Sequence, residues 1–389
     1  MMKSISKKIV AIALLGATTS LMAIYAEHAS LYKDPRIMGM GGANMAVGSY
    51  SSSVFQNPAG LANIKKEHGF VFDFIGVGVS VSDGAVDFAD EINAADGDIG
   101  KISDSLTKYA GDNMHIGVDN YTSLSKNSDA FAWSAGILAA SDINMMAHTD
   151  LTLDSTSRGY GGLVLGVAKP YETEFGRLDV GLGFKYIKMK SWSGKLTSTE
   201  LATLSKSDDA VEGIRNILNE RDETGLGLDV GVTYHPFVDN YWHPAVAMSI
   251  LNMGTIDMND AYGGQPMTVN FGLSITPEFP ILDKFVVAVD YIDMFNNITY
   301  KTSTEPNSPS YEESDFTKRI RAGVSVGLFD TWLMSTTLNG GLYQGAYTAG
   351  LDIELLIFKI NAATYQEEIG TGDISIPDRR YMARIGIGW

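Results

Sequence analysis

The chain contains no cysteine, so no disulfide framework can stabilise it. Long apolar runs are also missing after residue 23. Hydrophobic residues make up 45% of the 389 positions, yet the mean hydropathy is only +0.01. Apolar residues are therefore interspersed with polar ones, and no segment there approaches the ~20 apolar residues of a spanning helix. The mature chain is not expected to cross a membrane with helices.

Positive charge is scarce. The chain has 29 Lys and Arg against 46 Asp and Glu, which gives a net charge of −17. Binding to phosphate backbones needs clustered Lys and Arg, so the balance excludes nucleic acid as a partner. The six histidines show no metal-ligand spacing such as H-E-x-x-H. No metal and no cofactor is predicted.

The first residues have the order of a secretory signal. Lys3, Lys7 and Lys8 form a basic start, and residues 9–23 carry no charge. This apolar stretch is short and rich in small residues, which favours a signal peptide over a retained helical anchor, the alternative interpretation. We predict a signal peptide over residues 1–26 with cleavage near Ala26, Ala23 being the other candidate. The mature chain is then exported.

The rest of the chain repeats a period of two. Clear examples lie at 177–190, 224–234, 267–275 and 345–357, where apolar residues alternate with Gly, Asp, Thr and other polar residues. Ten-residue alternating segments are the signature of a transmembrane β-barrel, with one face toward lipid and the other toward the lumen. The 41 Gly and 18 Tyr are typical of barrel strands and their aromatic girdles.

The last ten residues form another such segment. One face carries Tyr381, Ile385, Ile387 and Trp389, and the other carries Arg380 and Arg384. A terminal aromatic residue in this register is what outer-membrane barrels carry as an assembly signal. We therefore expect the barrel-assembly machinery and outer-membrane lipid as partners.

Less regular alternation occurs near 70–81, 130–140, 143–153, 159–169, 243–252, 284–292, 318–328, 332–343 and 357–366. Together with the clear segments this predicts an all-β, antiparallel transmembrane barrel of about 14 strands. A soluble β-sandwich also alternates. The barrel is favoured because the polar face is rich in Gly and in Asp and Arg, and because the pattern spans nearly the whole mature chain.

Two acidic stretches have helical spacing instead, near 84–110 and 199–221. We expect short helical inserts in long outer loops. One interpretation is that they capture an apolar ligand, and the other is that they only cover the barrel mouth. The candidate capture residues are Phe88, Ile92, Leu106, Val211, Ile214 and Ile217.

An enzymatic role is not predicted. Residues 323–327 match G-x-S-x-G, but that motif needs a strand-turn-helix elbow, and Ser325 lies inside an alternating strand. Residues 96–100 (DGDIG) faintly resemble a Ca²⁺ loop, yet Thr107 stands where the twelfth-position Glu is needed.

The segment before the first strand carries the most distinctive motif. It contains Gly41, Gly42 and Ala43, and then Asn57, Pro58 and Ala59 within V-F-Q-N-P-A-G-L-A. This resembles the N-terminal hatch of the FadL family, the outer-membrane transporters of long-chain fatty acids and hydrocarbons in Gram-negative bacteria. The preceding D-P-R-I-M-G-M-G-G-A looks more like the related TraF-like branch. We expect a luminal hatch over 27–66 and the barrel over 67–389.

The resemblance implies passive transport of small hydrophobic molecules across the outer membrane. An apolar molecule would be caught outside, pass into the lumen and leave sideways through a kink in the wall when the hatch shifts. The alternative is a non-transporting outer-membrane protein of the TraF-like type, used in assembly, conjugation or secretion. A third hypothesis, a barrel hydrolase, requires a base beside Ser325.

Overall fold

The computed structural model describes residues 30–388, except 129, 207–216, 261, 302–309, 314 and 371–374. The predicted signal peptide therefore lies outside the described residues. The same holds for Trp389 of the proposed assembly signal and for the candidate capture residues Val211 and Ile214.

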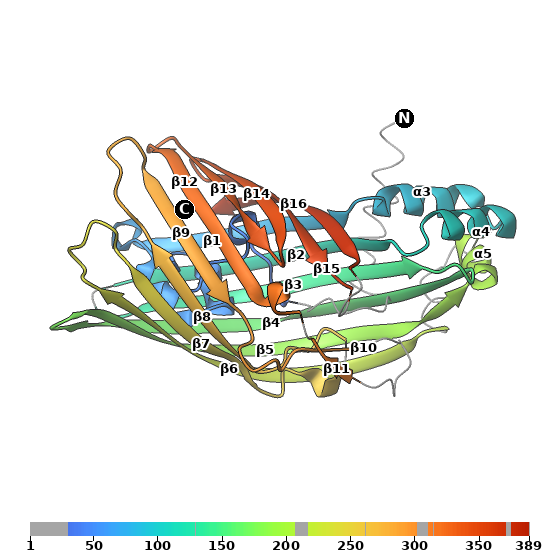
Figure 1. Ribbon diagram of the computed structural model, residues 1–389, viewed down its shortest axis with the longest axis horizontal. Helices are drawn as coiled ribbons and strands as arrows, with labels where there is room; N and C mark the ends of the chain where they lie inside the picture. The colour runs from blue at the N-terminus through green and yellow to red at the C-terminus, as the bar shows by residue number, and fades with distance from the viewer. Residues whose placement is uncertain are drawn as a thin grey trace.

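Within the described residues, fourteen antiparallel strands close into a barrel (Figure 1). Each strand pairs with its neighbours in the chain, and β1 closes the ring on β16. The predicted strand number and the antiparallel barrel are confirmed. The wall strands are β1 (Phe70–Ser82), β2 (Asn113–Asn127), β3 (Ala132–Ala147), β4 (Thr152–Thr173), β5 (Gly176–Thr197), β6 (Asn219–Pro236), β7 (Ala245–Gly254), β8 (Thr268–Ile275), β9 (Lys284–Tyr291), β12 (Ile320–Asp330), β13 (Met334–Tyr343), β14 (Ala346–Leu355), β15 (Phe358–Glu368) and β16 (Pro377–Gly388).

Two ends of the barrel can be told apart by their connections. Short turns such as 174–175 and 356–357 join the strands at one end, here called the turn end. The opposite loop end carries the long connections β1–β2, β5–β6 and β9–β12, the last holding the short hairpin β10 (Thr299–Lys301) and β11 (Ser310–Glu312). Outer-membrane barrels have short periplasmic turns and longer extracellular loops, so we expect the loop end to face the outside.

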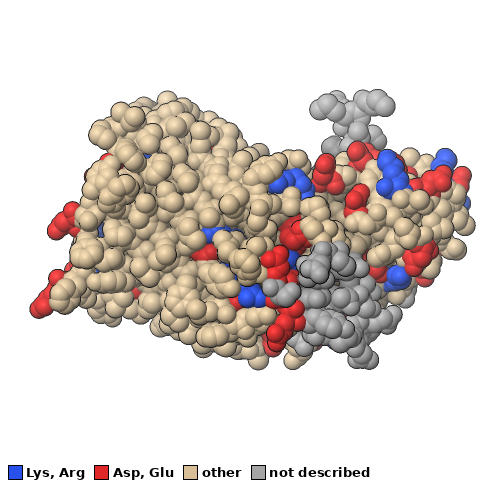
Figure 2. All heavy atoms as spheres, viewed as in Figure 1, with Lys and Arg blue, Asp and Glu red and all other residues tan. Residues whose placement is uncertain are grey.

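The outward face is apolar and the inward face is polar or small. On β16, Tyr381 and Ile385 are 50% and 64% exposed, whereas Arg380 and Arg384 are 0% and 5% exposed and face the lumen. Figure 2 shows a broad surface over the barrel with few charged side chains, while Asp, Glu, Lys and Arg gather toward the helical end. This is the distribution expected of a wall between lipid and lumen.

The strand positions correct the predicted segments in two places. The segment 113–127 was not predicted as a strand, although it forms β2. Its outward positions include Asn120 and Thr122, which weaken the alternation. Conversely, 130–140 and 143–153 are not two strands. Ser141 and Asp142 resemble a turn in sequence, but β3 continues through them because Arg158 of β4 pairs with Asp142 at 2.7 Å. The two errors cancel in the count.

The strands differ greatly in length. β4 and β5 have 22 residues each and β8 has 8. The long strands extend beyond the rest of the wall at the loop end, where α3 (Ala85–Ala95), α4 (Ile99–Lys108) and α5 (Ser198–Lys206) gather (Figure 1). Asp98 caps α4 by accepting hydrogen bonds from the amides of Gly100 and Lys101. The carboxylate that resembled a Ca²⁺ ligand is thus a helix cap.

The described polypeptide before β1, from residue 30 onward, lies largely inside the barrel (Figure 1). It holds α2 (Pro35–Gly39) and the single-turn helices η1 (Ser51–Phe55), η2 (Pro58–Asn63) and η3 (Lys66–His68). Two further single turns, η4 (Met258–Asp260) and η5 (Phe316–Arg319), lie in loop-end connections. In the described part of the chain, none of the helices has the length and apolar character needed to span a bilayer.

Candidate functional site

The described part of the predicted hatch, residues 30–66 and hereafter the hatch, packs against most of the wall. α2 contacts β13, β14, β15 and β16, and η2 contacts β2, β3, β4, β5 and β6. Asp34 caps α2 and Pro35 is its first residue, while Asn57 caps η2 ahead of Pro58. An Asp or Asn cap followed by Pro is a strong helix start, which explains why this glycine-rich segment folds into defined turns.

The hatch motif residues are among the most tightly held. Asn57 is 1% exposed. Its side-chain amide donates to the carbonyl of Met45 and to the hydroxyl of Thr233 on β6, both at 2.9 Å, and its oxygen accepts from the amide of Ala59 at 3.0 Å. Ala43 and Ala59 are fully buried. Gly41 and Gly42 have positive φ values of 68° and 78°, which other residues rarely adopt.

Glycines of the wall mark the path of the hatch. A Cβ at Gly181 would lie 2.2 Å from the amide nitrogen of Ala59, and one at Gly323 would lie 2.2 Å from the carbonyl oxygen of Met40. Similar close approaches occur at Gly231, Gly272, Gly341 and Gly350. Part of the glycine-rich inward face seen in the sequence therefore lets the hatch backbone lie directly on the strands.

Charged side chains fix the hatch at two further points. Asp290 of β9 is fully buried and accepts hydrogen bonds from the amides of Asn44 and Met45 at 2.7 and 3.0 Å. On the opposite side, Asp73 of β1 pairs with Lys359 of β15 at 2.8 Å and accepts from the hydroxyl of Ser51 at 2.8 Å. Buried carboxylates that accept several hydrogen bonds are strongly held, so these ties resist displacement of the hatch.

Within the hatch, Asp34 and Arg36 form a buried pair at 2.6 Å, and Ser52 donates to Asp34 at 2.6 Å. Burial alone would raise the pKa of Asp34, but the adjacent Arg36 guanidinium outweighs it and lowers that pKa to about 2. The guanidinium also stacks on the ring of Tyr50 at 4.2 Å. The pair therefore stays ionised at neutral pH.

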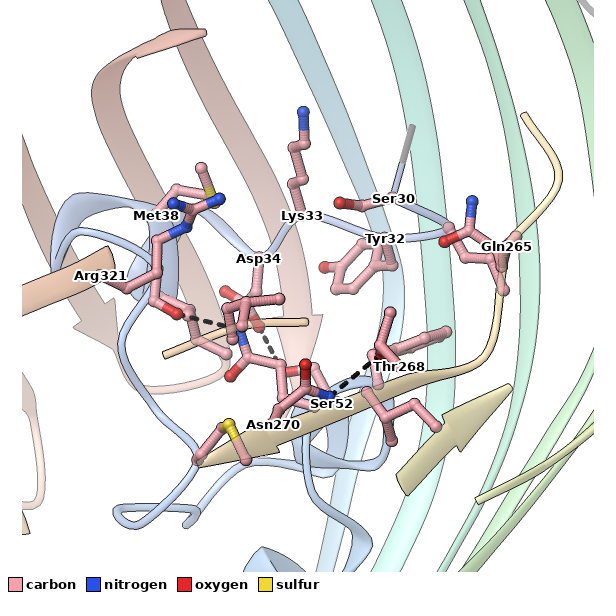
Figure 3. Close-up of a pocket in the computed structure, with 18 of the residues that line it drawn as sticks. Ser30, Tyr32, Lys33, Asp34, Met38, Ser52, Gln265, Thr268, Asn270 and Arg321 are labelled. Atoms are coloured by element: carbon pink, nitrogen blue, oxygen red, sulfur yellow. Dashed lines mark hydrogen bonds between the residues drawn. The ribbon is translucent and has the colours of Figure 1, made fainter. Parts of the chain in front are cut away.

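A cavity of about 130 Å³, the loop-side cavity, lies between the hatch and the wall. Figure 3 shows Tyr32 and Asp34 of the hatch, Thr268 and Asn270 of β8, and Arg321 of β12 around it. Its lining is mixed. The apolar part includes Leu31, Tyr32, Ile37, Met38, Phe55 and Leu251, and the charged part is Lys33, Asp34, Lys185 and Arg321. On the other side of the hatch, a larger turn-side cavity of about 850 Å³ is lined by residues of the turn end, including Arg177, His235 and Lys284.

The pairing of β1 is irregular with both of its neighbours, as at a β-bulge. Pairing with β2 jumps from Asp73 to Val77, and pairing with β16 jumps from Phe74 to Val77. Two side chains replace the missing ladder bonds. Asn120 donates to the carbonyl of Gly76 at 3.2 Å, and Arg384 donates to the carbonyl of Tyr121 at 2.9 Å. We call this stretch of β1, residues 74–76, the wall break.

An aromatic cluster joins the cavity to the wall break. Tyr32 and Phe55 line the cavity, and their rings lie 5.4 and 5.0 Å from that of Tyr121, the residue whose carbonyl Arg384 holds. Asp34 also lines the cavity, while Arg36 lines a small space of about 10 Å³ at the wall break. The Asp34–Arg36 pair thus lies between the loop-side cavity and the wall break.

The structure gives the helical inserts a packed core. Phe88 and Leu106 are 2% and 0% exposed and Ile92 packs against the same cluster, which also contains Trp192 and Leu201. Ile217 is 36% exposed. The cluster joins α3, α4 and α5 to the extended ends of the long strands. The sequence therefore located the inserts. The resemblance implied a kink in the wall, but neither its position on β1 nor the residues of the loop-side cavity were identified from the sequence.

The G-x-S-x-G match does not form a catalytic elbow. Ser325 is buried inside β12, a continuous strand, so the elbow required by G-x-S-x-G is not formed. Among the described residues, no group of three His, Asp or Glu side chains could hold a metal ion.

Solved structures of two transport proteins resemble this architecture. The toluene transporter TbuX of Ralstonia pickettii superposes with a TM-score of 0.53 at 12% identity, covering 92% of this chain and 98% of that one. A deletion mutant (deltaS2) of the monoaromatic hydrocarbon channel TodX gives 0.53 at 11% identity, with 92% and 99% covered. The chain has a FadL-type barrel fold. No protein-family model and no curated protein sequence matches it.

The predicted FadL-like fold is thus confirmed at the level of architecture. The TraF-like branch, the signal peptide, the domain bounds and the assembly signal stay predictions. The FadL-type barrel described here has its hatch inside the lumen, a cavity of mixed lining beside that hatch, and the irregular stretch of β1, the wall break, in the adjoining wall.

Proposed function

We propose that this FadL-type barrel is a passive outer-membrane channel for small hydrophobic molecules, closed by its hatch. The observation that carries the proposal is the loop-side cavity beside the wall break. The solved barrels that resemble it are described as a toluene transporter and a monoaromatic hydrocarbon channel. Those are transport proteins rather than enzymes.

The size and lining of the cavity support a small apolar ligand. An apolar cavity of roughly 150 Å³ is enough to hold benzene, and the loop-side cavity measures about 130 Å³. Its apolar side chains come from the hatch and from the wall, where Leu251, Ile292 and Tyr343 contribute, so a ligand there would contact both. Ligand binding is then expected to act on hatch packing directly.

The route out of the cavity follows the aromatic cluster. From Tyr32 and Phe55 a ligand reaches Tyr121, which lies opposite the stretch where the pairing of β1 with β2 is irregular. Only side chains block this route, those of the Asp34–Arg36 pair and of Arg384. No backbone pairing between strands has to open. A shift of α2 would connect the cavity with the wall break, and the ligand would leave sideways into the membrane without crossing the turn-side cavity.

The candidate capture site at the helical inserts is the other place where a ligand could first bind. Phe88 and Leu106 are committed to the core there, so Ile217 is the described member that could meet a ligand. We expect the loop-side cavity to be the principal site.

We expect the folded barrel to contact outer-membrane lipid and the nascent barrel to contact the barrel-assembly machinery.

The test is displacement of a fluorescent apolar dye, N-phenyl-1-naphthylamine, by toluene from the refolded barrel. We expect saturable binding. Leu251→Trp should abolish it by filling the cavity, and the matched change Leu182→Trp on the outward face should leave it intact. Ile217→Arg should have little effect, and a strong effect would move the site to the inserts.

Heat-modifiable migration in gels establishes that each barrel variant is folded. Absence of saturable binding to a folded wild-type barrel would contradict the proposal. The non-transporting, TraF-like role would then be the better hypothesis.

A further inference from the structure

A second luminal cavity, of about 50 Å³, lies on the loop side of the hatch near the β1–β16 seam. Ser80 of β1 and His115 of β2 both line it. The hydroxyl of Ser80 lies 2.8 Å from Nε2 of His115, and Nδ1 of His115 lies 2.8 Å from Oδ1 of Asn144 on β3. Serine, imidazole and amide therefore form one hydrogen-bonded chain across three adjacent strands.

The partners of Asn144 decide the direction of these hydrogen bonds. Arg380 can only donate, and its Nη2 lies 3.2 Å from Oδ1 of Asn144. The amide nitrogen of Asn144 donates to the hydroxyl of Tyr262 at 2.8 Å. Oδ1 is therefore an acceptor, and the proton lies on Nδ1 of His115. Nε2 is left as an acceptor, so the hydroxyl of Ser80 donates to it, the arrangement in which imidazole acts as a general base.

The pair opens toward the cavity because the neighbouring residue is Gly117. A Cβ at Gly117 would lie 2.5 Å from the hydroxyl oxygen of Ser80 and 3.0 Å from Nε2 of His115. Any side chain there would cover both groups. Hatch residues 30–33 line both this cavity and the loop-side cavity. Because about 50 Å³ is too small for a whole ester, the substrate has to extend from this cavity into the adjoining loop-side cavity.

Both cations and carboxylates line this cavity, the carboxylates being Asp119 and Asp142. The cations are the groups that suit a developing oxyanion. Arg380 lines the same cavity, and Arg158 and Lys33 do so from β4 and from the hatch. Arg380 is paired with Asp378 at 2.6 Å, and Arg158 is paired with Asp142 at 2.7 Å. A fixed guanidinium in a largely enclosed site stabilises negative charge on a carbonyl oxygen.

We propose that Ser80, His115 and Asn144 form a nucleophilic site that hydrolyses small uncharged carboxylic esters inside the lumen. Ser80 Oγ attacks the ester carbonyl carbon while its proton passes to Nε2 of His115. The carbon–oxygen bond to the alcohol breaks, and the alcohol leaves with the proton from Nε2. Water, giving its proton to Nε2, then cleaves the acyl-serine and releases the acid, and Ser80 recovers its proton. Asn144 is a positioning residue that holds the imidazole tautomer.

The first test is labelling of the refolded barrel with a small fluorophosphonate, followed by mass spectrometry of the peptides. We expect the label on Ser80. Ser80→Ala should abolish labelling, and His115→Gln should slow it by about a hundredfold or more, the usual share of a general base. Ser325→Ala is the matched control, since it removes another buried luminal serine and should leave labelling unchanged.

Hydrolysis of p-nitrophenyl acetate gives the second readout. Asn144→Ala should lower kcat more than it changes KM, and Asn144→Asp should restore much of the loss because a carboxylate accepts the same Nδ1 proton. Tyr32→Ala, which widens both cavities, should raise the rate. If Ser80 is unlabelled in the folded wild type and in Tyr32→Ala, or if hydrolysis survives Ser80→Ala, the chain is a structural hydrogen-bond network and the proposal fails. Dye binding is measured separately, so this outcome leaves the channel proposal untouched.

Discussion

Replacing Asn57 by Ala is expected to loosen the hatch while leaving the wall intact. The change removes two hydrogen bonds that Asn57 donates, to Met45 and Thr233, and the cap that it provides to η2. Each buried hydrogen bond contributes about 0.5–1.5 kcal/mol, and loss of an N-cap costs about 0.5–2 kcal/mol. The sum is roughly 1.5–5 kcal/mol of hatch docking.

A loss of that size multiplies the population of the undocked hatch by about 10–4000-fold, since 1.4 kcal/mol is a factor of ten. The assay is single-channel conductance in planar bilayers. The wild type should show rare openings and Asn57→Ala frequent ones, at the same melting temperature of the barrel.

The matched control is Asn361→Ala. Asn361 is also a buried luminal asparagine, but its amide donates at 3.0 Å to Asp352, a residue of the neighbouring strand and not of the hatch. It should conduct like the wild type. Equal conductance of Asn57→Ala and wild type would refute the view that these contacts keep the hatch closed.

Three further changes test how the hatch is held and where a ligand leaves. Gly181→Ala should push the hatch away and make it sensitive to protease, because its Cβ would meet the backbone of Ala59, whereas Gly340→Ala, with its nearest neighbour at 3.9 Å, should not. Arg384→Ala should widen the wall break and speed uptake of an apolar dye into cells, and an unchanged rate would argue against this exit. The pKa of Asp34 is about 2, below its ordinary 3.8, so its contribution to hatch docking is complete above pH 4 and declines as the pH falls toward 2. Protease protection constant from pH 7 to 4 and lost near pH 2 is expected, and earlier loss would assign the effect to other groups.

The alternation of apolar and polar residues was sufficient to predict the barrel, because lipid on one side and a lumen on the other impose a period of two on each strand. The hatch motif was visible for a similar reason, since capped turns need Asn, Pro and Gly at fixed positions. The prediction missed β2, where Asn120 faces outward and bonds to the wall break instead of meeting lipid.

The site itself could not be derived in the same way. The loop-side cavity is formed by residues from the hatch and from distant strands, such as Phe55 and Leu251, whose proximity depends on barrel closure. The contact of Ser80 with His115 depends on the register of β1 against an unpredicted strand. The G-x-S-x-G motif pointed to Ser325 because a motif relates residues that are adjacent in sequence. The hydrogen-bonded chain of Ser80, His115 and Asn144 instead joins residues of three different strands.

The most direct test of a hatch-gated channel is a reversible lock. The chain lacks cysteine, so Asn57→Cys with Thr233→Cys introduces a single pair where the native side chains touch at 2.9 Å. Uptake of N-phenyl-1-naphthylamine is followed in intact Gram-negative cells. We predict faster uptake with the wild-type barrel than without it, a fall to background when the pair is oxidised, and recovery on reduction. Uptake that is the same in the locked and reduced states would contradict gating by the hatch, and wild-type uptake no faster than background would contradict transport.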